Sequence, residues 1–246
     1  RFLGIDEPLY ISSTSDLPAL SGLASSSCFA VGLLNALHQL KGEQVSLAQI
    51  AEEACHIEIN VLKKPIGKQD QYAAAFGGAN LFTFNSNGSV LLAPVTNPTF
   101  FNIFENSLLF YTEIQRSADE VLSDQKNSFS SNEKNLLEIK ELAAQFYDLI
   151  NEPKIRLEKL GELLHQNWVS KKMLSEKISN SLIDDYYEAA LKNGAFGGKI
   201  LGAGGGGFLF LLAPKENHAK IIKTLNKLEM VDFKFEPIGT RTLLNF

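Results

Sequence analysis

Apolar residues recur at helical spacing in two segments of the first third of the chain. In the segment 26–40 they fall every three or four positions, and Gly42 follows as a stop signal. The segment 46–62 repeats this spacing and opens with Ser46 and Gln49 in the pattern of a capping box. We predict one helix in each segment. The apolar face of the second helix is predicted to comprise Ile50, Ala54, Ile57 and Val61.

Shorter apolar runs predict strands toward both ends of the chain, with helices between them. Asn87-Gly88 is typical of the turn in a β-hairpin. The expected strands are 8–16, the two arms of that hairpin within 81–94, 107–114, the runs on either side of the glycines at 202–207, and 233–239. The expected further helices are a short one ending at Gly77, about three pieces between 132 and 192, and one from about Glu216. This order favours two α+β domains over an alternating parallel sheet.

The composition is that of a globular chain, with 45% hydrophobic and 21% charged residues among 246. The net charge is −5 and no basic block occurs, which argues against a nucleic-acid partner and an anionic membrane surface. No apolar run is long enough to span a bilayer and no signal peptide is visible, so we expect a cytoplasmic protein. Cys28 and Cys55 are expected to be buried, reduced thiols. Because a predicted strand comes soon after Arg1, we expect further sequence ahead of it.

The glycine-rich stretch 202–207 formally matches the pattern GxGxxG. A dinucleotide-binding loop needs a helix directly after it, whereas "FLFLLAP" follows here and predicts a strand. The phosphate-loop pattern GxxxxGK[ST] does not occur in the sequence either. One or two glycines would suffice for a tight turn, so four in a row favour the close approach of another backbone or of a ligand.

Three consecutive serines, 25–27, precede an apolar helix, and Gly22 lies just before them. A helix N-terminus attracts anions, and a serine hydroxyl there can ligate Mg²⁺. An ordinary N-cap is an equally good interpretation of this feature alone. Asp70, beside Lys68 at a predicted helix start, could accept a proton from a substrate hydroxyl. Glu58 could face solvent or a metal. For either acid alone, a solvated surface carboxylate is the favoured interpretation.

Taken together, these stretches resemble the GHMP kinases, the family of galactose, homoserine, mevalonate and phosphomevalonate kinases. "LPALSGLASSSCFAVGLLNAL" resembles its second motif, "ILGAGGGGF" its third, and "IGKQDQYAAAFGGANLF" the stretch with the catalytic Asp. "LLFYTEIQRSADEVL" and "LGELLHQNWVSKK" are similar to the branch that phosphorylates D-glycero-D-manno-heptose 7-phosphate and includes L-fucose kinases. The first family motif is absent. Leu20 and Ala24 stand where Gly is common in these kinases.

The resemblance implies a role for each matched residue. Asp70 is implied as the catalytic base, with Ser26 and Glu58 as the magnesium ligands. The residues implied to bind the nucleotide are Gly22, Leu23, Ala24, Ser25, Ser26, Ser27, Gly204, Gly205 and Gly206. The residues implied to contact the substrate are Lys68, Gln69, Asp70, Tyr72, Arg116 and Gly204, with Lys68 and Arg116 as candidates for its phosphate.

The implied fold is α+β, with an incomplete ribosomal-protein-S5-like domain at 1–98 and a ferredoxin-like domain at 99–246. The implied activity is ATP- and Mg²⁺-dependent phosphorylation of the anomeric hydroxyl of the heptose 7-phosphate, giving the 1,7-bisphosphate. The alternatives are a kinase of L-fucose or another free sugar, and a non-catalytic relative that binds nucleotide or sugar. The expected partner is a small sugar or sugar phosphate, and the protein is expected to be a monomer or homodimer.

Overall fold

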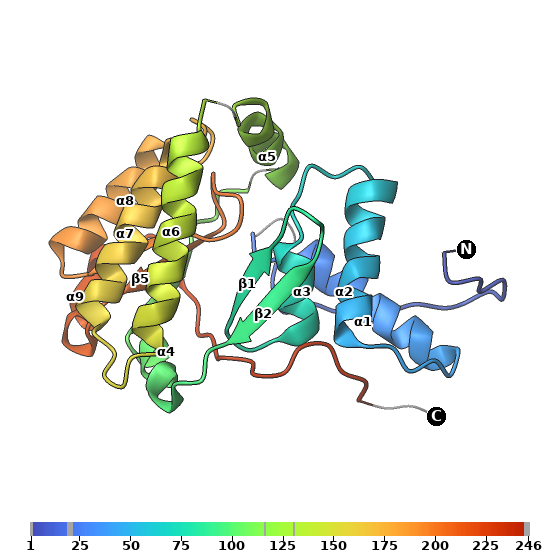
Figure 1. Ribbon diagram of the computed structural model, residues 1–246. Coiled ribbons are helices and arrows are strands. Elements are labelled where there is room, and N and C mark those ends of the chain that lie inside the picture. Colours follow the sequence, from blue (N-terminus) through green and yellow to red (C-terminus); the bar gives the residue numbers. More distant parts are fainter. Residues whose placement is uncertain (1, 19–21, 116, 130, 244–246) are drawn as a thin grey trace. The chain divides into compact units, whose positions relative to one another are not determined.

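The structure is a computed structural model that describes residues 2–18, 22–115, 117–129 and 131–243 (Figure 1). These residues divide into two compact units. The first unit comprises Arg1–Ala19, Ala24–Gly78 and Glu236–Phe246, and the second comprises Leu20–Leu23 and Ala79–Phe235. Leu20 and Arg116 lie outside the described residues.

The first unit is built from helices that pack on one another. They are α1 (Ser25–Leu40), α2 (Leu47–Cys55), the π-helical turn η1 (His56–Val61) and α3 (Gln69–Phe76). The predicted helices at 26–40 and before Gly77 are therefore confirmed. Ser46 caps α2, since its side chain accepts a hydrogen bond from the Gln49 N–H at 3.1 Å. Val31, Ile50 and Ala54 form part of its core.

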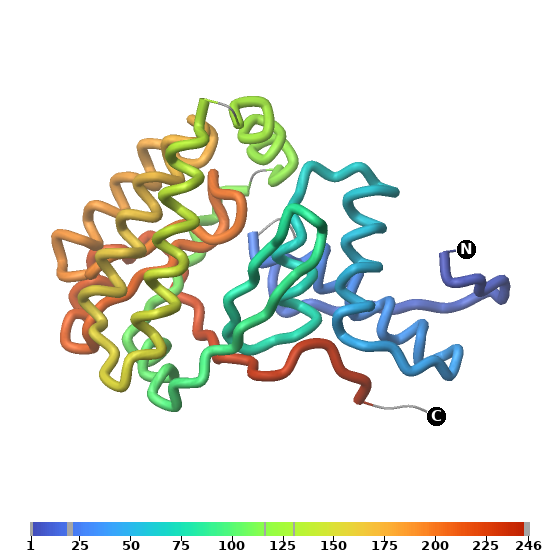
Figure 2. Tube along the Cα trace, viewed as in Figure 1, coloured from blue at the N-terminus to red at the C-terminus, as the bar shows by residue number. Residues whose placement is uncertain are grey.

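The C-terminal segment of the chain returns to the first unit (Figure 2). The Gly78 N–H donates to the Glu236 carbonyl at 3.0 Å, and the Thr240 N–H donates to the Ala74 carbonyl at 3.1 Å. A Cβ on Gly77 would lie 2.2 Å from the backbone nitrogen of Gly239, so the two backbones can meet only without that side chain. This segment therefore closes over the end of α3.

The second unit contains two antiparallel sheets. The predicted hairpin is confirmed as β1 (Asn80–Phe84) and β2 (Val90–Pro94). The larger sheet has the order β4-β5-β3-β6. Its strands are β3 (Ser107–Tyr111), β4 (Gly197–Ile200), β5 (Phe208–Leu212) and β6 (Glu229–Met230). In chain order these strands and their intervening helices give β-α-β-β-α-β, so the predicted ferredoxin-like arrangement is confirmed.

Helices cover the larger sheet of the second unit. The predicted helical region is confirmed as α6 (Glu133–Ile150), α7 (Leu157–Lys172) and α8 (Ser181–Lys192). Figure 1 shows these three helices side by side, and α7 and α8 contact β4. The predicted helix from about Glu216 is α9 (Lys215–Thr224). Trp168, Ile183 and Leu211 are fully buried in the core between helices and sheet.

The short segments η2 (Pro98–Phe101) and α4 (Asn102–Glu105) lead into β3. The helix α5 (Ala118–Asn127) was not expected, because its strongly polar sequence leaves Val121 as its one buried residue in the described chain. None of the described helices combines the length and apolar character needed to cross a membrane.

Two predicted strands are wrong. Residues 8–16 are irregular, and the Tyr10 side chain is 95% exposed. The alternating pattern of this segment has no neighbouring strand to pair with in the described part of the chain. Residues 233–239 form no strand either, because the ring of Phe235 packs against Phe100 and Phe104 before Pro237 removes a backbone donor.

The two units also differ in extent from the predicted domains 1–98 and 99–246. The hairpin β1–β2 groups with the second unit, and the segment Glu236–Phe246 groups with the first. A family-domain boundary near Pro98 stays a prediction, since a compact unit and a family domain need not share their limits.

Candidate active site

A buried carboxylate, Glu58, gathers polar side chains in the first unit. The Ser26 hydroxyl donates to Glu58 Oε1 and the Ser27 hydroxyl donates to Oε2, each at 2.7 Å. Gln71 Nε2 donates to Oε2 at 2.6 Å, and Lys64 Nζ donates to Oε1 at 3.1 Å. We call these five residues the Glu58 cluster. Glu58 is 2% exposed, so the solvated surface carboxylate favoured for it alone is wrong.

The π-helical turn explains why Glu58 points inward. An uninterrupted α-helix would place Ile57 and Val61 on the face of Ile50 and Ala54, as predicted. The wider turn at His56–Val61 shifts that register, so Glu58 is buried and Val61 is 57% exposed. The predicted apolar face is therefore correct for α2 and wrong for Val61.

The electrostatic state of Glu58 follows from its contacts. Burial raises the pKa of this carboxyl, but the hydrogen bonds from Ser26, Ser27, Lys64 and Gln71 outweigh burial and hold its pKa below the ordinary value. The side chain is thus ionised at neutral pH. The oxygen of Gln71, Oε1, is buried without a hydrogen-bond partner among the described residues, which leaves one acceptor in the cluster for a ligand or water.

The serine run is not an ordinary N-cap. The N-cap of α1 is Ala24, which has no side-chain capping hydrogen bond, while the hydroxyls of Ser26 and Ser27 turn to Glu58. Ala24 adopts left-handed backbone angles, φ 57° and ψ 25°. Because no side chain caps the helix, the N–H groups of its first turn, including that of Ser25, can donate hydrogen bonds to an anion. This placement is what a phosphate site requires.

Asp70 lies in the first turn of α3 and is half-buried. The N-terminal end of a helix favours the ionised carboxylate. Partial desolvation of its sulfur raises the pKa of the Cys28 thiol on α1 although the residue as a whole is exposed, and the charges of Asp70 and Glu58 raise it further. The negative charges of Asp70 and Glu58 therefore lie close enough to the first turns of α1 to affect Cys28. Cys28 itself is exposed, so its predicted burial is wrong, whereas Cys55 is buried as predicted.

Two residues predicted to contact the substrate, Lys68 and Tyr72, form hydrogen bonds with the carboxylate of Glu52. Lys68 Nζ contacts Glu52 at 2.9 and 3.0 Å, and the Tyr72 hydroxyl donates to Glu52 Oε1. Partial burial raises the pKa of Glu52, but the hydrogen bonds from Tyr72 and Lys68 outweigh it and lower the pKa. Gln69 opens α3 with an exposed side chain. A substrate contact of Lys68, Gln69 or Tyr72 stays a prediction, as does that of Arg116.

A cavity of about 400 Å³ in the first unit is lined in part by residues of the Glu58 cluster. Its walls are mostly apolar and include Phe29 and Leu33 of α1. Ser26, Glu58 and Lys64 supply polar lining. These three side chains can therefore be reached from solvent even though Glu58 is almost fully buried.

In the second unit, the glycine loop, residues 202–207, is held by backbone contacts. The Gly205 N–H donates to the Ile178 carbonyl at 2.7 Å, and the Gly207 N–H donates to the Ile114 carbonyl at 2.9 Å. A Cβ on Gly204 would lie 2.9 Å from the Ile178 carbonyl oxygen. The predicted close approach of another backbone is confirmed, and β5 after the loop confirms that it is no dinucleotide-binding fingerprint.

The glycine loop also contacts the segment that precedes α1. A Cβ on Gly202, at φ +66°, would lie 2.4 Å from the Gly22 carbonyl oxygen, and one on Gly22 would lie 3.2 Å from the Leu201 carbonyl oxygen. Leu23 follows in the same unit and is half-buried. The Lys171 ammonium, at the end of α7, donates to the Gly202 carbonyl. Gly206 is packed as tightly, because a Cβ there would lie 2.2 Å from the Ile114 carbonyl oxygen.

The sequence interpretation missed three residues that the structure places at these sites, namely Gln71, Lys64 and Lys171. Gln71 holds Glu58, Lys64 gives it a positive charge, and Lys171 donates to the Gly202 carbonyl. Ser27, predicted to bind the nucleotide, also holds Glu58. Gln71 carried a signal, because it is an uncharged polar residue beside Asp70 in a predicted short helix of small residues. The structure shows it 0% exposed. Lys64 and Lys171 carried none that distinguishes them from the other lysines of their segments.

Comparisons with known proteins agree with this arrangement. Residues 1–78 match the GHMP kinases N terminal domain and residues 134–227 match the GHMP kinases C terminal domain. The chain is 33% identical, over 234 residues, to the D-glycero-alpha-D-manno-heptose 7-phosphate kinase of Campylobacter jejuni, covering 93% of this chain and 68% of that protein. It is 26% identical to the galactokinase of Pyrococcus furiosus, covering 82% of this chain and 64% of that one.

A solved structure shows the same fold. The D-glycero-D-manno-heptose 1-phosphate kinase from Bacteroides thetaiotaomicron matches with a TM-score of 0.70 at 24% identity, over 91% of this chain and 64% of that one. The chain thus spans about two thirds of the length of these relatives. Matches to both domains of one family, together with 33% identity to a heptose 7-phosphate kinase, show that the chain belongs to the GHMP kinase family.

Proposed function

We propose that this protein transfers the γ-phosphoryl group of ATP to the anomeric hydroxyl of a heptose 7-phosphate, giving the 1,7-bisphosphate. The observation that carries the proposal is the Glu58 cluster at the N-terminus of α1, with Asp70 at the start of α3 in the same unit. The choice of sugar rests on the identity with the Campylobacter jejuni enzyme.

The residues present fit a magnesium ion. Mg²⁺ prefers oxygen ligands and usually takes one or two protein groups, with phosphates and water completing its shell. Ser26 and Glu58 offer a hydroxyl and an ionised carboxylate side by side, and no group of three or more His, Cys, Asp or Glu side chains suited to a metal occurs among the described residues. When bound, the ion neutralises charge on the transferred phosphoryl group. In this proposal Ser26 and Glu58 hold it.

The phosphates of ATP would bind at the N-terminus of α1 in this proposal. No side chain caps this helix, so it offers backbone N–H groups to an anion. Such a site acts by position and electrostatics, which is the main requirement of phosphoryl transfer. Nucleotide binding by Gly22, Gly204, Gly205 and Gly206 of the second unit stays a separate prediction.

Asp70 is proposed as the base. Its carboxylate would accept the proton of the anomeric hydroxyl while that oxygen forms a bond to the γ-phosphorus, and the bond from phosphorus to the bridging oxygen breaks with ADP as the leaving group. Asp70 lies in the first turn of α3, where the helix dipole favours a negative charge.

The test is ADP release by the purified protein with D-glycero-D-manno-heptose 7-phosphate, its dephosphorylated form, L-fucose and galactose. We expect turnover of the heptose phosphate and a kcat about 100-fold or more lower in Asp70→Asn. Asp148→Asn on the exposed face of α6 is the matched control and should keep wild-type turnover. Preference for the dephosphorylated sugar or L-fucose would contradict the substrate, and ATP binding without turnover of any sugar would contradict the enzyme.

A further inference from the structure

Lys64 supplies the one positive charge within the Glu58 cluster. The other three donors, Ser26, Ser27 and Gln71, are neutral, whereas the Lys64 ammonium lies 3.1 Å from Glu58 Oε1. A carboxylate that is 2% exposed depends strongly on a positive charge nearby, because burial penalises its ionised form. In the structure, Lys64 meets that requirement.

The two oxygens of Glu58 have different surroundings. Oε2 is held by Ser27 and Gln71, both of which are buried. Oε1 is shared by Ser26 and Lys64 and belongs to the side of the cluster that lines the cavity. Oε2 is therefore the anchored oxygen and Oε1 the one that can change partners.

Oε1 is also the oxygen next to Ser26, the second proposed magnesium ligand. A divalent cation bound by Oε1 and the Ser26 hydroxyl would bring two positive charges together at one oxygen if Lys64 stayed in place. The Lys64 side chain is 28% exposed and has a flexible four-carbon stem, so its ammonium can withdraw into water.

We propose that Lys64 is the resident counter-ion of Glu58, which a divalent cation must displace to bind. This inference rests on the proposed function, because it takes Ser26 and Glu58 as the magnesium ligands. Lys64 balances the charge of Glu58 and holds Oε1 in position while no metal is bound, and it weakens the affinity for Mg²⁺ by competing for Oε1. It is thus a positioning residue that sets the magnesium concentration at which the site fills.

The test is a titration of MgCl₂ at saturating ADP, followed by the thermal unfolding midpoint. In EDTA, Lys64→Met should unfold at a lower temperature than wild type, since Glu58 then lacks its positive partner. Its half-saturating Mg²⁺ concentration should be about fivefold lower than that of wild type. Lys64→Arg should shift that concentration upward, because a guanidinium pairs more strongly with a carboxylate.

Lys63→Met is the matched control, since it removes the same charge from the adjacent residue, whose ammonium is not a donor to Glu58 in the structure. It should leave the half-saturating concentration at the wild-type value. The inference is overturned if Lys64→Met behaves like Lys63→Met or needs more Mg²⁺ than wild type. Should Lys64→Met give no cooperative transition, the upward shift in Lys64→Arg decides, and its absence overturns the inference.

Glu58→Gln separates this inference from the proposed function. If Glu58→Gln keeps the full magnesium-dependent stabilisation, then Glu58 is no magnesium ligand and the proposed metal site is wrong. If Glu58→Gln abolishes that stabilisation while Lys64→Met matches wild type, the metal site stands and only the role of Lys64 fails.

Discussion

The Glu58 cluster and the glycine loop are held rigid in opposite ways. The cluster is built from side chains, with four donors around one buried carboxylate. The glycine loop is built from backbone, and its contacts with Ile114, Ile178 and Gly22 depend on the absence of side chains. The first arrangement is sensitive to a change of charge, whereas the second is sensitive to added volume.

The largest effect is expected from adding one methyl group to the glycine loop. Gly202→Ala would place a Cβ 2.4 Å from the Gly22 carbonyl oxygen and 3.0 Å from its Cα, and Gly202 has a φ of +66°. Neither backbone can yield without moving the other, so we expect a loss of more than about 3 kcal/mol in the free energy of unfolding. Urea denaturation of wild type and variant measures it.

Gly88→Ala in the β1–β2 turn is the matched control for that substitution. Gly88 has a φ of +87° but open space around its Cβ position. This variant should therefore lose only the cost of backbone strain, about 1 kcal/mol in the free energy of unfolding. Equal losses in the two variants would show that the contact between Gly202 and Gly22 is unimportant for stability. The comparison of the two regions would then lose its basis.

The glycine loop was predictable from the sequence because composition alone limits its structure. A run of four glycines costs conformational entropy that a simple turn does not require, and the strand-forming residues of Phe208–Leu212 exclude a helix after it. The partners of the loop were not predictable. Ile114 and Gly22 are distant in sequence, and nothing local indicates which backbone approaches.

The Glu58 cluster was predictable only in part. The family resemblance indicated Ser26 and Glu58, but the solvent-facing interpretation of Glu58 assumed a regular helix. The π-helical turn changes which residues face inward, and periodicity counted at 3.6 residues per turn cannot detect it. Lys64 and Gln71 reach Glu58 across 6 and 13 residues, a juxtaposition that depends on how α2, η1 and α3 pack.

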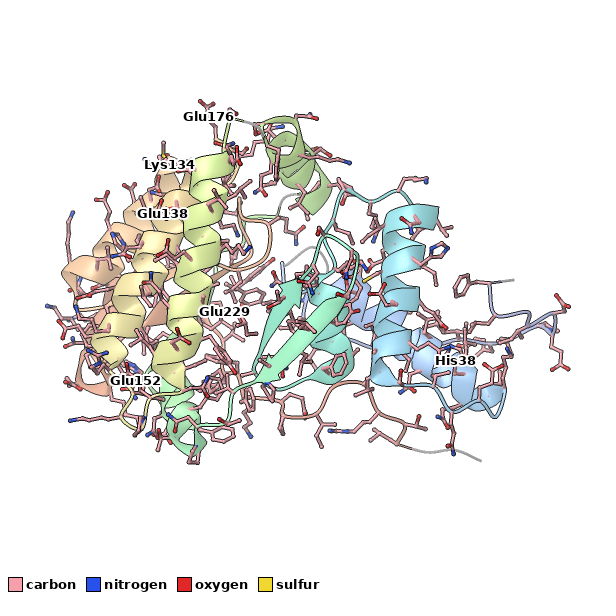
Figure 3. The ribbon with its side chains drawn as sticks, in the orientation of Figure 1. His38, Lys134, Glu138, Glu152, Glu176 and Glu229 are labelled. Carbon is pink, nitrogen blue, oxygen red and sulfur yellow. The ribbon has the colours of Figure 1, made fainter. Side chains whose placement is uncertain are left out.

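A second effect concerns another buried charge of the first unit. His38, on α1 (Figure 3), is 2% exposed, and its two ring nitrogens lie 2.7 Å from carboxylate oxygens of Glu43 and Glu53. Both carboxylates only accept, so the ring is the doubly protonated imidazolium. Burial lowers the pKa of His38, but the hydrogen bonds to Glu53 and Glu43 outweigh burial and raise it above the ordinary value.

The sign of the pH effect follows from this raised pKa. His38 contributes its full stability below the unfolded pKa of about 6.5, and this contribution is lost as pH rises through the folded value. We expect the free energy of unfolding to fall more in wild type than in His38→Gln as pH rises above 6.5. Lys41 contacts Glu43 and Gln49 contacts Glu53, so both carboxylates keep a partner in the variant.

Urea denaturation at several pH values measures this difference. His165→Gln is the control from the second unit, because His165 contacts the Tyr187 hydroxyl and no carboxylate in the described structure. It should show the wild-type pH dependence. Parallel curves for wild type and His38→Gln would mean that the buried charges of the first unit do not distinguish it from the second.

The smallest effect is expected at Ala24 in the first unit. This residue has a left-handed backbone conformation, which in the glycine loop is adopted by glycine residues. Ala24 has a φ of 57°, which costs an L-residue about 1 kcal/mol and glycine almost nothing. Ala24→Gly also frees the unfolded chain, which offsets part of that gain. We therefore expect a net stabilisation of about 0.5 kcal/mol.

Ala36→Gly, at an exposed helical position of the same α1, should instead lose about 1 kcal/mol. A loss at both positions, measured by urea denaturation, would show that the start of α1 depends on the Ala24 side chain itself and that backbone conformation does not explain its stability.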